Sequence, residues 1–449
     1  MKRTLIRHAT IVNEGQSVFG SVVIEDGCIA EVLANRQTPS APCDETVDVT
    51  GCCLLPGVID DHVHFRDPGL THKADILSES RAAAAGGVTS IMDMPNTSPL
   101  TTTLEALEAK RELLSQKCIV NYSCYFGATN DNYTEFDKLD RRHVCGIKLF
   151  MGSSTGNMLV DRQESLRRIF NGTDMLIAAH CEDQDIIRQN AAYYQEKFHG
   201  QPDVPVELHP SIRSAEACHH SSALAVRLAT EAHARLHLLH ISTARELSLL
   251  SNAPLSQKRI TAEACIAHLV FDKDDYHTLG TRIKCNPAIK DKSDREALRT
   301  AVNQGYIDVI ATDHAPHLLS EKEGGALKAT SGMPMIQFSL VAMLELAHEG
   351  VFTPETVVEK MCHAPARLFG IRQRGYIRPG YRADLVVVRP NTPWQVTPEI
   401  VQSKCGWSPL EGRTFHWKIE KTFVNGRLIF DGKQVDEQYR GEELLMVNE

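Results

Sequence analysis

Residues 54–65, LLPGVIDDHVHF, indicate the fold of this chain, because they form a short apolar run that ends in two histidines, His62 and His64. Seven more apolar runs of similar length follow, and helical patterns lie between them. The eight runs cover 54–65, 86–96, 119–128, 145–152, 175–183, 234–242, 259–265 and 308–316. Eight alternations of strand and helix predict an α/β chain folded as a (β/α)8 TIM-like barrel.

The two ends of the chain differ from this middle part, because both read as short strands and turns. Asn425-Gly426, between two apolar runs near the end, favours a hairpin. Neither end is long enough to bury a good core alone. We therefore predict one small β-sandwich module built from residues 1–55 and 366–449, beside a barrel over residues 56–365.

The composition is that of an ordinary globular protein, with 42% hydrophobic and 23% charged residues. The net charge of -9 argues against a nucleic-acid surface and against a basic membrane-binding face. The sequence has neither an apolar stretch of about 18 residues nor the pattern of a signal peptide. Its 13 cysteines include no CxxC pair, which fits free thiols in a reduced compartment. We expect a cytoplasmic protein without a nucleic-acid or membrane partner.

Metal-binding side chains lie where the predicted strands end. His62 and His64 are two residues apart on one strand, so their side chains face the same side. The residues on the other strands are Lys148 on the fourth, His180 on the fifth, His240 on the sixth and Asp313 on the eighth. Any one of them alone is more often a packing residue or an ion-pair partner. Together they predict a metal centre at the C-terminal rim of the barrel.

The order of these residues resembles the amidohydrolase superfamily, in the type with two metals and a carboxylated lysine. The resemblance implies two Zn2+ per chain, with these ligands: His62, His64 and Asp313 for the more buried ion, His180 and His240 for the more exposed one, and carboxylated Lys148 bridging both. The chemistry is sensible, because burial favours a neutral amine that can add CO₂. The two oxygens of the resulting carbamate can bridge cations about 3.5–4 Å apart.

Two longer motifs narrow the resemblance to dihydroorotases. They are DDHVHFRDPG at 60–69 and ATDHAPHLLSEK at 311–322, and GWSPLEG at 406–412 is a further family-like run. The resemblance covers nearly the whole chain. It implies an enzyme that reversibly cyclises N-carbamoyl-L-aspartate to (S)-dihydroorotate with loss of water, in de novo pyrimidine biosynthesis. It also implies a metal-bridging hydroxide as nucleophile and Asp313 as general acid and base.

Dihydroorotate carries a ring carboxylate, which a selective site must bind. On a continuing strand Arg66 would face the same side as the two histidines, and its guanidinium can bind a carboxylate bidentately. The resemblance assigns Arg66, Asn96 and His317 to this carboxylate and Asn286 to the pyrimidine ring. The structural alternatives are an ion pair of Arg66 with Asp67 and turns at the two asparagines.

Four further features have a structural alternative or are expected to play no part. Residues 152–158, GSSTGNM, resemble a loop that closes over substrate, and a solvated turn is the alternative. Glu182 is expected either to orient His180 or to lie at the surface. His237 and His314 are expected to point away from the rim.

Other functions remain open. Allantoinase, hydantoinase and dihydropyrimidinase activities would keep the fold, the metals and the mechanism, and would change only the ring. A silent relative that acts as a scaffold would be expected to have lost metal ligands, whereas all six positions are filled here. By analogy we expect a homo-oligomer that acts on a small molecule, and the resemblance also raises an association with aspartate transcarbamoylase.

Overall fold

Parallel strands form the centre of the molecule in the computed structural model, which describes residues 2–35, 37–152 and 157–447. They are β6 (Val58–Val63), β7 (Val88–Asp93), β8 (Asn121–Cys124), β9 (Phe126–Gly127), β10 (Ile147–Phe150), β11 (Ile177–His180), β12 (Leu236–Leu238), β13 (Ile260–Cys265) and β14 (Val309–Ala311). One hydrogen-bonded arc contains β6 to β8 and the other β9 to β14. The third predicted strand is split between β8 and β9. A parallel bridge between Val63 and His314 closes the circle and confirms the predicted barrel.

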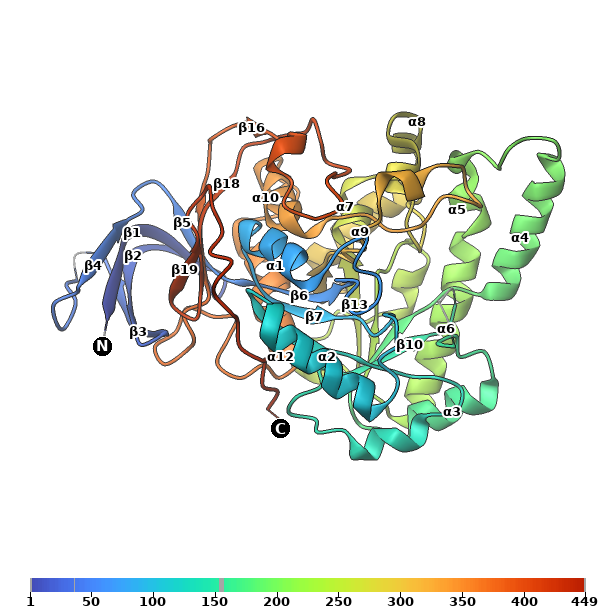
Figure 1. Ribbon diagram of the computed structural model, residues 1–449, viewed down its shortest axis with the longest axis horizontal. Coiled ribbons are helices and arrows are strands. Elements are labelled where there is room, and N and C mark those ends of the chain that lie inside the picture. Colours follow the sequence, from blue (N-terminus) through green and yellow to red (C-terminus); the bar gives the residue numbers. More distant parts are fainter. Residues whose placement is uncertain (1, 36, 153–156, 448–449) are drawn as a thin grey trace.

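Helices lie outside these strands (Figure 1). The longer ones are α1 (Ile76–Ala85), α2 (Leu104–Lys117), α3 (Gln163–Asn171), α4 (Gln184–Lys197), α6 (Ala215–Ala232), α9 (Lys292–Gln304) and α10 (Ser339–His348). The shorter ones are α5 (His209–Ile212), α7 (Ile266–Val270), α8 (Tyr276–Leu279), α11 (Pro354–Val358) and α12 (Ala364–Leu368). Helix α1 shows how the sequence builds them. Asp75 caps its first turn by accepting from the Ser78 backbone N–H, and Ala82–Ala85 are buried.

Strands from both ends of the chain form one eight-stranded sheet beside the barrel (Figure 1). Its members are β1 (Arg3–Asn13), β2 (Gln16–Glu25), β3 (Cys28–Ala34), β4 (Glu45–Asp48), β5 (Cys53–Pro56), β15 (Leu385–Arg389), β18 (Lys418–Val424) and β19 (Arg427–Phe430). Strand β5 pairs with both β1 and β15, so the two ends meet inside the sheet. This confirms a separate β-module from both ends. Asn425 and Gly426 form the predicted hairpin turn, with φ of 49° and 77°.

A buried polar network joins this sheet to the barrel. Asp384, just before β15, pairs with Arg374 and accepts hydrogen bonds from the Asn425 backbone N–H at 2.8 Å and from Asn121 Nδ2 at 3.2 Å. Arg374 is 5% exposed and donates to Asn425 Oδ1 at 2.7 Å and to Glu442 Oε2 at 2.9 Å. Because Asn121 opens β8, the network holds the C-terminal strands against the barrel wall.

The thirteen cysteines all carry free thiols, and nine of them are buried. In the part of the chain that the structure describes, no helix has the length and apolarity needed to cross a membrane.

Candidate metal centre

Three of the predicted ligands meet where β6 and β14 end. Oδ1 of Asp313 lies 3.3 Å from Nε2 of His62 and 3.1 Å from Nε2 of His64. Asp313 follows β14 with a φ of 47°, and His64 is the first residue after β6. The three side chains offer ligand atoms that are close enough together to hold one metal ion.

The two imidazoles of this group are also held through their other nitrogens. Nδ1 of His62 lies 3.0 Å from Oε1 of Glu263, and Nδ1 of His64 lies 2.7 Å from Oδ1 of Asn96. Since carboxylate and amide oxygens only accept, each neutral ring carries its proton on Nδ1. The lone pair is then on Nε2, which faces Asp313. Metal-binding histidines are characteristically oriented in this way, so the donor set fits a divalent cation such as zinc.

His180 and His240 form a second pair at the ends of neighbouring strands. Nδ1 of His180 lies 2.8 Å from Nε2 of His240, so the two nitrogens converge on one point. Glu182 holds the other nitrogen of His180 at 3.1 Å, and Arg213 pairs with the same carboxylate. The backbone N–H of His240 donates to Oε1 of Glu263 at 2.9 Å. This pair too can share one cation.

Lys148 is a buried lysine beside both groups. Lys148 is 1% exposed, and its Nζ lies 4.6 Å from the centre of the Phe150 ring. Burial lowers the pKa of Lys148 to about 8. The rings of His62 and His240 are 5.4 Å apart, so the two groups are adjacent. Among the described residues, no carboxylate forms an ion pair with Lys148.

The charges of His62, His64 and Asp313 depend on one another. Although burial opposes ionisation, His62 and His64 hold the pKa of the Asp313 carboxyl well below its usual range. Burial also opposes the charged form of His62, yet Glu263 and Asp313 raise its pKa. Burial dominates at His64 and lowers its pKa to about 3. Asp313 is therefore a carboxylate at neutral pH, next to nitrogens that can bind a cation.

A cluster of basic side chains, to which Glu321 adds one carboxylate, lies beside the candidate metal-binding residues. Arg66 and His317 are each 8% exposed, and Nη2 of Arg66 lies 3.1 Å from Nε2 of His317. Nε of Arg66 donates to the Pro316 carbonyl at 3.1 Å, and Nδ1 of His317 lies 3.0 Å from Nζ of Lys73. Burial, followed by the charges of Arg66 and Lys73, lowers the pKa of His317. The sequence indicated Arg66 and His317 but not Lys73.

Arg66 reaches this cluster by a different route from the one that the sequence suggested. The alternation argument required a strand that continues through Arg66, and this is wrong, because β6 ends at Val63 and Arg66 has a φ of 66°. The left-handed turn brings Arg66 to His317 instead. The alternative ion pair with Asp67 is also wrong, because Asp67 pairs with Lys117 at 2.8 Å.

The two predicted asparagines lie in different places. The amide oxygen of Asn96 contacts His64, as described above, so Asn96 belongs to the candidate metal-binding group. Oδ1 of Asn286 lies 3.2 Å from Nε2 of His209, and the same nitrogen lies 2.9 Å from the Cys285 carbonyl. The structure thus joins Asn96 to the first group and places Asn286 against His209.

Glu263 is the residue that sequence reasoning missed. The run RITAEAC was recognised as a strand, but its glutamate was not singled out. A carboxylate inside an apolar strand was the available signal, since a buried charge needs partners. The surface alternative for Glu182 is wrong, because that residue is 0% exposed and contacts His180.

The remaining predictions at the rim concern two histidines and a loop. His237 faces Asp61, at 3.4 Å, and His314 faces Glu79, at 2.8 Å, so both point away from the proposed ligands as expected. The expectation that residues 152–158 form a loop over the substrate is not tested, because residues 153–156 lie outside the described part of the chain.

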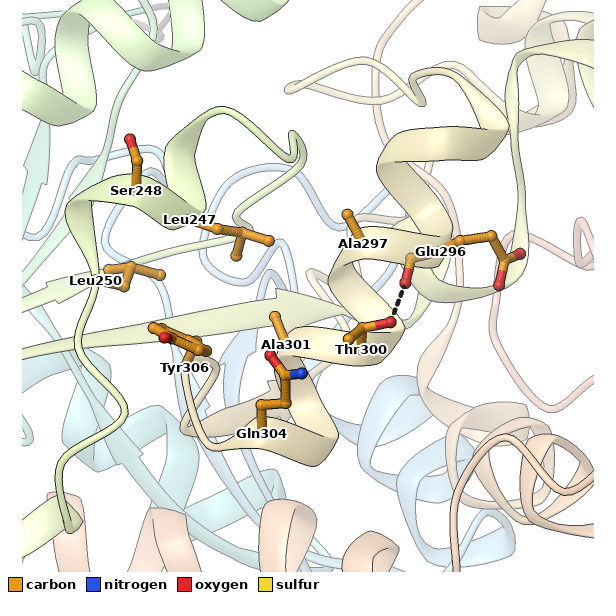
Figure 2. A pocket seen from close by; sticks show the side chains of 9 residues that line it. All are labelled: Leu247, Ser248, Leu250, Glu296, Ala297, Thr300, Ala301, Gln304 and Tyr306. Atoms are coloured by element: carbon orange, nitrogen blue, oxygen red, sulfur yellow. Dashed lines mark hydrogen bonds between the residues drawn. The ribbon is translucent and has the colours of Figure 1, made fainter.

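A separate surface hollow lies between η3 (Glu246–Leu249) and α9. It has a volume of about 640 Å³, and Figure 2 shows the side chains that line it. Leu250, Ala301 and Tyr306 give it an apolar wall, while the Thr300 hydroxyl donates to the Glu296 backbone carbonyl at 2.9 Å. None of the predicted site residues lines this hollow.

Comparisons with known proteins indicate the family of this chain. Residues 53–429 match the amidohydrolase family. The chain is 34% identical to a dihydroorotase of Halobacterium salinarum over 385 residues, which are 85% of this chain and 87% of that protein. It is 30% identical to an allantoinase of Solibacter usitatus over 453 residues, 99% of this chain and 97% of that protein. The structure of L-hydantoinase (dihydropyrimidinase) from Arthrobacter aurescens is similar, with a TM-score of 0.93 and 26% identity, and the match covers 99% of this chain and 100% of that chain.

Proposed function

Because this chain belongs to the amidohydrolase family, whose members include cyclic-amide hydrolases, we propose that it is a dihydroorotase. It would interconvert N-carbamoyl-L-aspartate and (S)-dihydroorotate, as a step of pyrimidine biosynthesis in the cytoplasm. The observation that carries the proposal is the contact between Arg66 and His317, which puts cationic and hydrogen-bond-donating groups beside the metal-binding residues.

The balance of donors and acceptors in this cluster supports binding of an anion. Lys73 and Arg66 can only donate, and they face Nδ1 and Nε2 of His317, although a neutral imidazole has a single acceptor nitrogen. Nε2 also lies 3.1 Å from the Ser331 carbonyl, and Lys73 has a second acceptor in Glu321, 2.9 Å away. Among the described residues, only Nε and Nη2 of Arg66 have hydrogen-bond partners, so Nη1 keeps its donors for a ligand. A ring carboxylate matches this demand by charge and by its two acceptor oxygens.

The metal-binding residues fit two zinc ions on the grounds of donor chemistry and orientation. We assign one ion to His62, His64 and Asp313 and the other to His180 and His240, as the family resemblance implies. Lys148, carboxylated by CO₂, would bridge them. Two observations support this role: Lys148 is buried, and among the described residues no carboxylate forms an ion pair with it, although the charges of Asp313 and Glu263 act on it. A bridging carbamate would turn the buried cation into an anionic ligand.

The side chains of this site can carry the proton transfers of the reaction. Bound metal would supply Lewis acidity, polarising the ring amide carbonyl and lowering the pKa of water. In the hydrolytic direction Asp313 takes the proton of the attacking water and delivers it to the departing ring nitrogen. Arg66 holds the ring carboxylate, and the NH₂ group of Asn96, whose oxygen is engaged by His64, is the part that faces substrate. We keep Asn286 as a contact of the pyrimidine ring.

The second candidate is hydrolysis of another cyclic amide. Relatives named allantoinase and hydantoinase have similar or lower identity to this chain, so the ring remains the open choice. Those rings lack the carboxylate that the Arg66 cluster would bind, which is why we favour dihydroorotate. A homo-oligomer and an association with aspartate transcarbamoylase also remain proposals.

The decisive experiment combines metal analysis with a substrate panel. The purified full-length protein is assayed for zinc and for turnover of N-carbamoyl-L-aspartate, dihydroorotate, allantoin and hydantoin. We expect about two zinc ions per chain and turnover of only the first two compounds. Turnover of allantoin or hydantoin instead would replace the substrate and keep the metal centre, and a metal-free, inactive protein would overturn both.

A further inference from the structure

A second group of metal-binding side chains lies outside the barrel rim. Glu345 and His348 belong to α10, and His416 lies between β17 (Thr414–Phe415) and β18. Each of the three offers a ligand atom, and these atoms all lie within 4.8 Å of one another. We propose that this group, the α10 site, binds one divalent transition-metal ion such as Zn2+.

The chain already brings the three side chains together. Glu345 and His348 are three residues apart, so they share one face of α10. Oε2 of Glu345 accepts from the His416 backbone N–H at 2.7 Å, and Oε1 lies 2.7 Å from Nδ1 of the same residue. The rings of His348 and His416 are stacked, with centroids 4.3 Å apart. Binding therefore needs side-chain rotation but no refolding of the backbone.

Two imidazoles and a carboxylate are a donor set that zinc prefers. Tetrahedral zinc has ligand bonds of about 2.0–2.2 Å, which separates its ligand atoms by roughly 3.4 Å. The ion would take the place of the hydrogen bond between Nδ1 of His416 and Oε1 of Glu345, and these two atoms would move slightly apart. His348 is exposed, so its ring is free to turn toward the ion. Water would complete the four ligands.

Helix α10 contributes negative charge to the α10 site, and the guanidinium of Arg413 is close enough to interact with the carboxylates of Glu345 and Glu349. Helix α10 ends at His348, so its last carbonyl groups and the negative end of its dipole lie at the site. Glu349 follows directly and adds a carboxylate to this end of the helix. The side chain of His416 is 38% exposed and that of Glu345 is 13% exposed, so an ion can enter from solvent.

The ion would connect two parts of the chain. Helix α10 covers the barrel, whereas His416 follows the short ladder of β17 with β16 (Trp394–Gln395), which lies next to α10 (Figure 1). Occupancy would stabilise this junction, because a metal that binds only the folded state raises its stability. It would not touch the proposed catalytic residues.

The test compares zinc content in the full-length protein and in two variants. His348→Asn removes one exposed ligand, and the matched control His199→Asn changes an exposed histidine far from α10 in sequence. All three proteins are equilibrated with the same buffered free zinc and analysed by mass spectrometry. We expect wild type and His199→Asn to hold one more zinc per chain than His348→Asn. Zinc should also raise the Tm of these two proteins more than that of His348→Asn.

Equal zinc content in all three proteins would overturn the proposal. So would anomalous scattering at the zinc edge that shows no peak between Glu345, His348 and His416. Because the readout is a difference between proteins that share the same barrel rim, it does not depend on how many ions the rim holds. Failure of the dihydroorotase proposal would leave this result unchanged.

Discussion

Nδ1 of His62 and Oε1 of Glu263 lie 3.0 Å apart, although the two residues belong to strands at distant positions in the sequence. The same carboxylate oxygen accepts the backbone N–H of His240 at 2.9 Å. Glu263 thus contacts residues of both candidate metal-binding groups. It determines the tautomer of one proposed ligand and the position of another.

Replacing Glu263 tests this positioning. Glu263→Gln keeps the size of the side chain but removes the charge that polarises His62, so we expect zinc affinity to fall about 10-fold or more. Competition with a chelator measures the affinity, with the exposed Glu323→Gln as control. An unchanged zinc affinity in Glu263→Gln would contradict the role.

Replacing Lys148 tests the bridging ligand. Lys148→Ala should lose most bound metal and activity, and short-chain carboxylic acids should restore part of both by supplying the missing anionic bridge. Metal analysis and turnover with added acetate check this. The control is Lys258→Ala, because the Lys258 side chain is also buried but pairs with Asp308 at 2.8 Å. Two metal ions per chain in Lys148→Ala would refute the bridge.

Replacing Arg66 tests the choice of substrate. Arg66→Gln removes charged hydrogen bonds to a ring carboxylate, so we expect a loss of about 3 kcal/mol, or roughly 150-fold in kcat/KM, for dihydroorotate. Any residual turnover of hydantoin, which has no carboxylate, should change much less. Equal losses on both rings would mean that Arg66 has a structural role only.

Replacing Arg374 tests the junction between barrel and sheet. Arg374→Met leaves the buried Asp384 without its cation, and breaking such a pair lowers stability by about 3–5 kcal/mol. Arg427→Met, in an exposed pair with Asp436, should lower it by less than about 1 kcal/mol. Urea denaturation midpoints compare the two. Equal midpoints would show that the buried network contributes nothing to stability.

The equilibrium of the proposed reaction should depend on pH. N-carbamoyl-L-aspartate has two carboxylates and dihydroorotate has one, so ring closure consumes a proton. Closure should therefore be favoured at lower pH, and the ratio of ring to linear form should fall as the pH rises. Chromatography of the equilibrium mixture between about pH 6 and 8 measures it. A flat ratio would exclude this reaction.

Much of the fold could be predicted from local patterns. Eight apolar runs separated by helical patterns indicated the barrel, and the apolar runs around Asn425 indicated the terminal hairpin. The spacing of apolar residues and the residues that form turns depend only on neighbours in the sequence, so they can be predicted from one chain. The left-handed turn at Arg66 could not be predicted, because arginine rarely adopts a φ of 66° and the position has no glycine.

The sequence alone determined which donors stand at the strand ends, since each of those residues is tied to a strand that its own neighbours define. Tertiary structure decided which donors meet. Glu263 reaches His62, and Lys73 reaches His317, across 201 and 244 residues of chain. The physical reason is that a closed barrel brings strand ends together by hydrogen-bond register and closure, which are relations between distant segments. The orientation of each imidazole, and with it the chemistry of the site, follows from those distant partners.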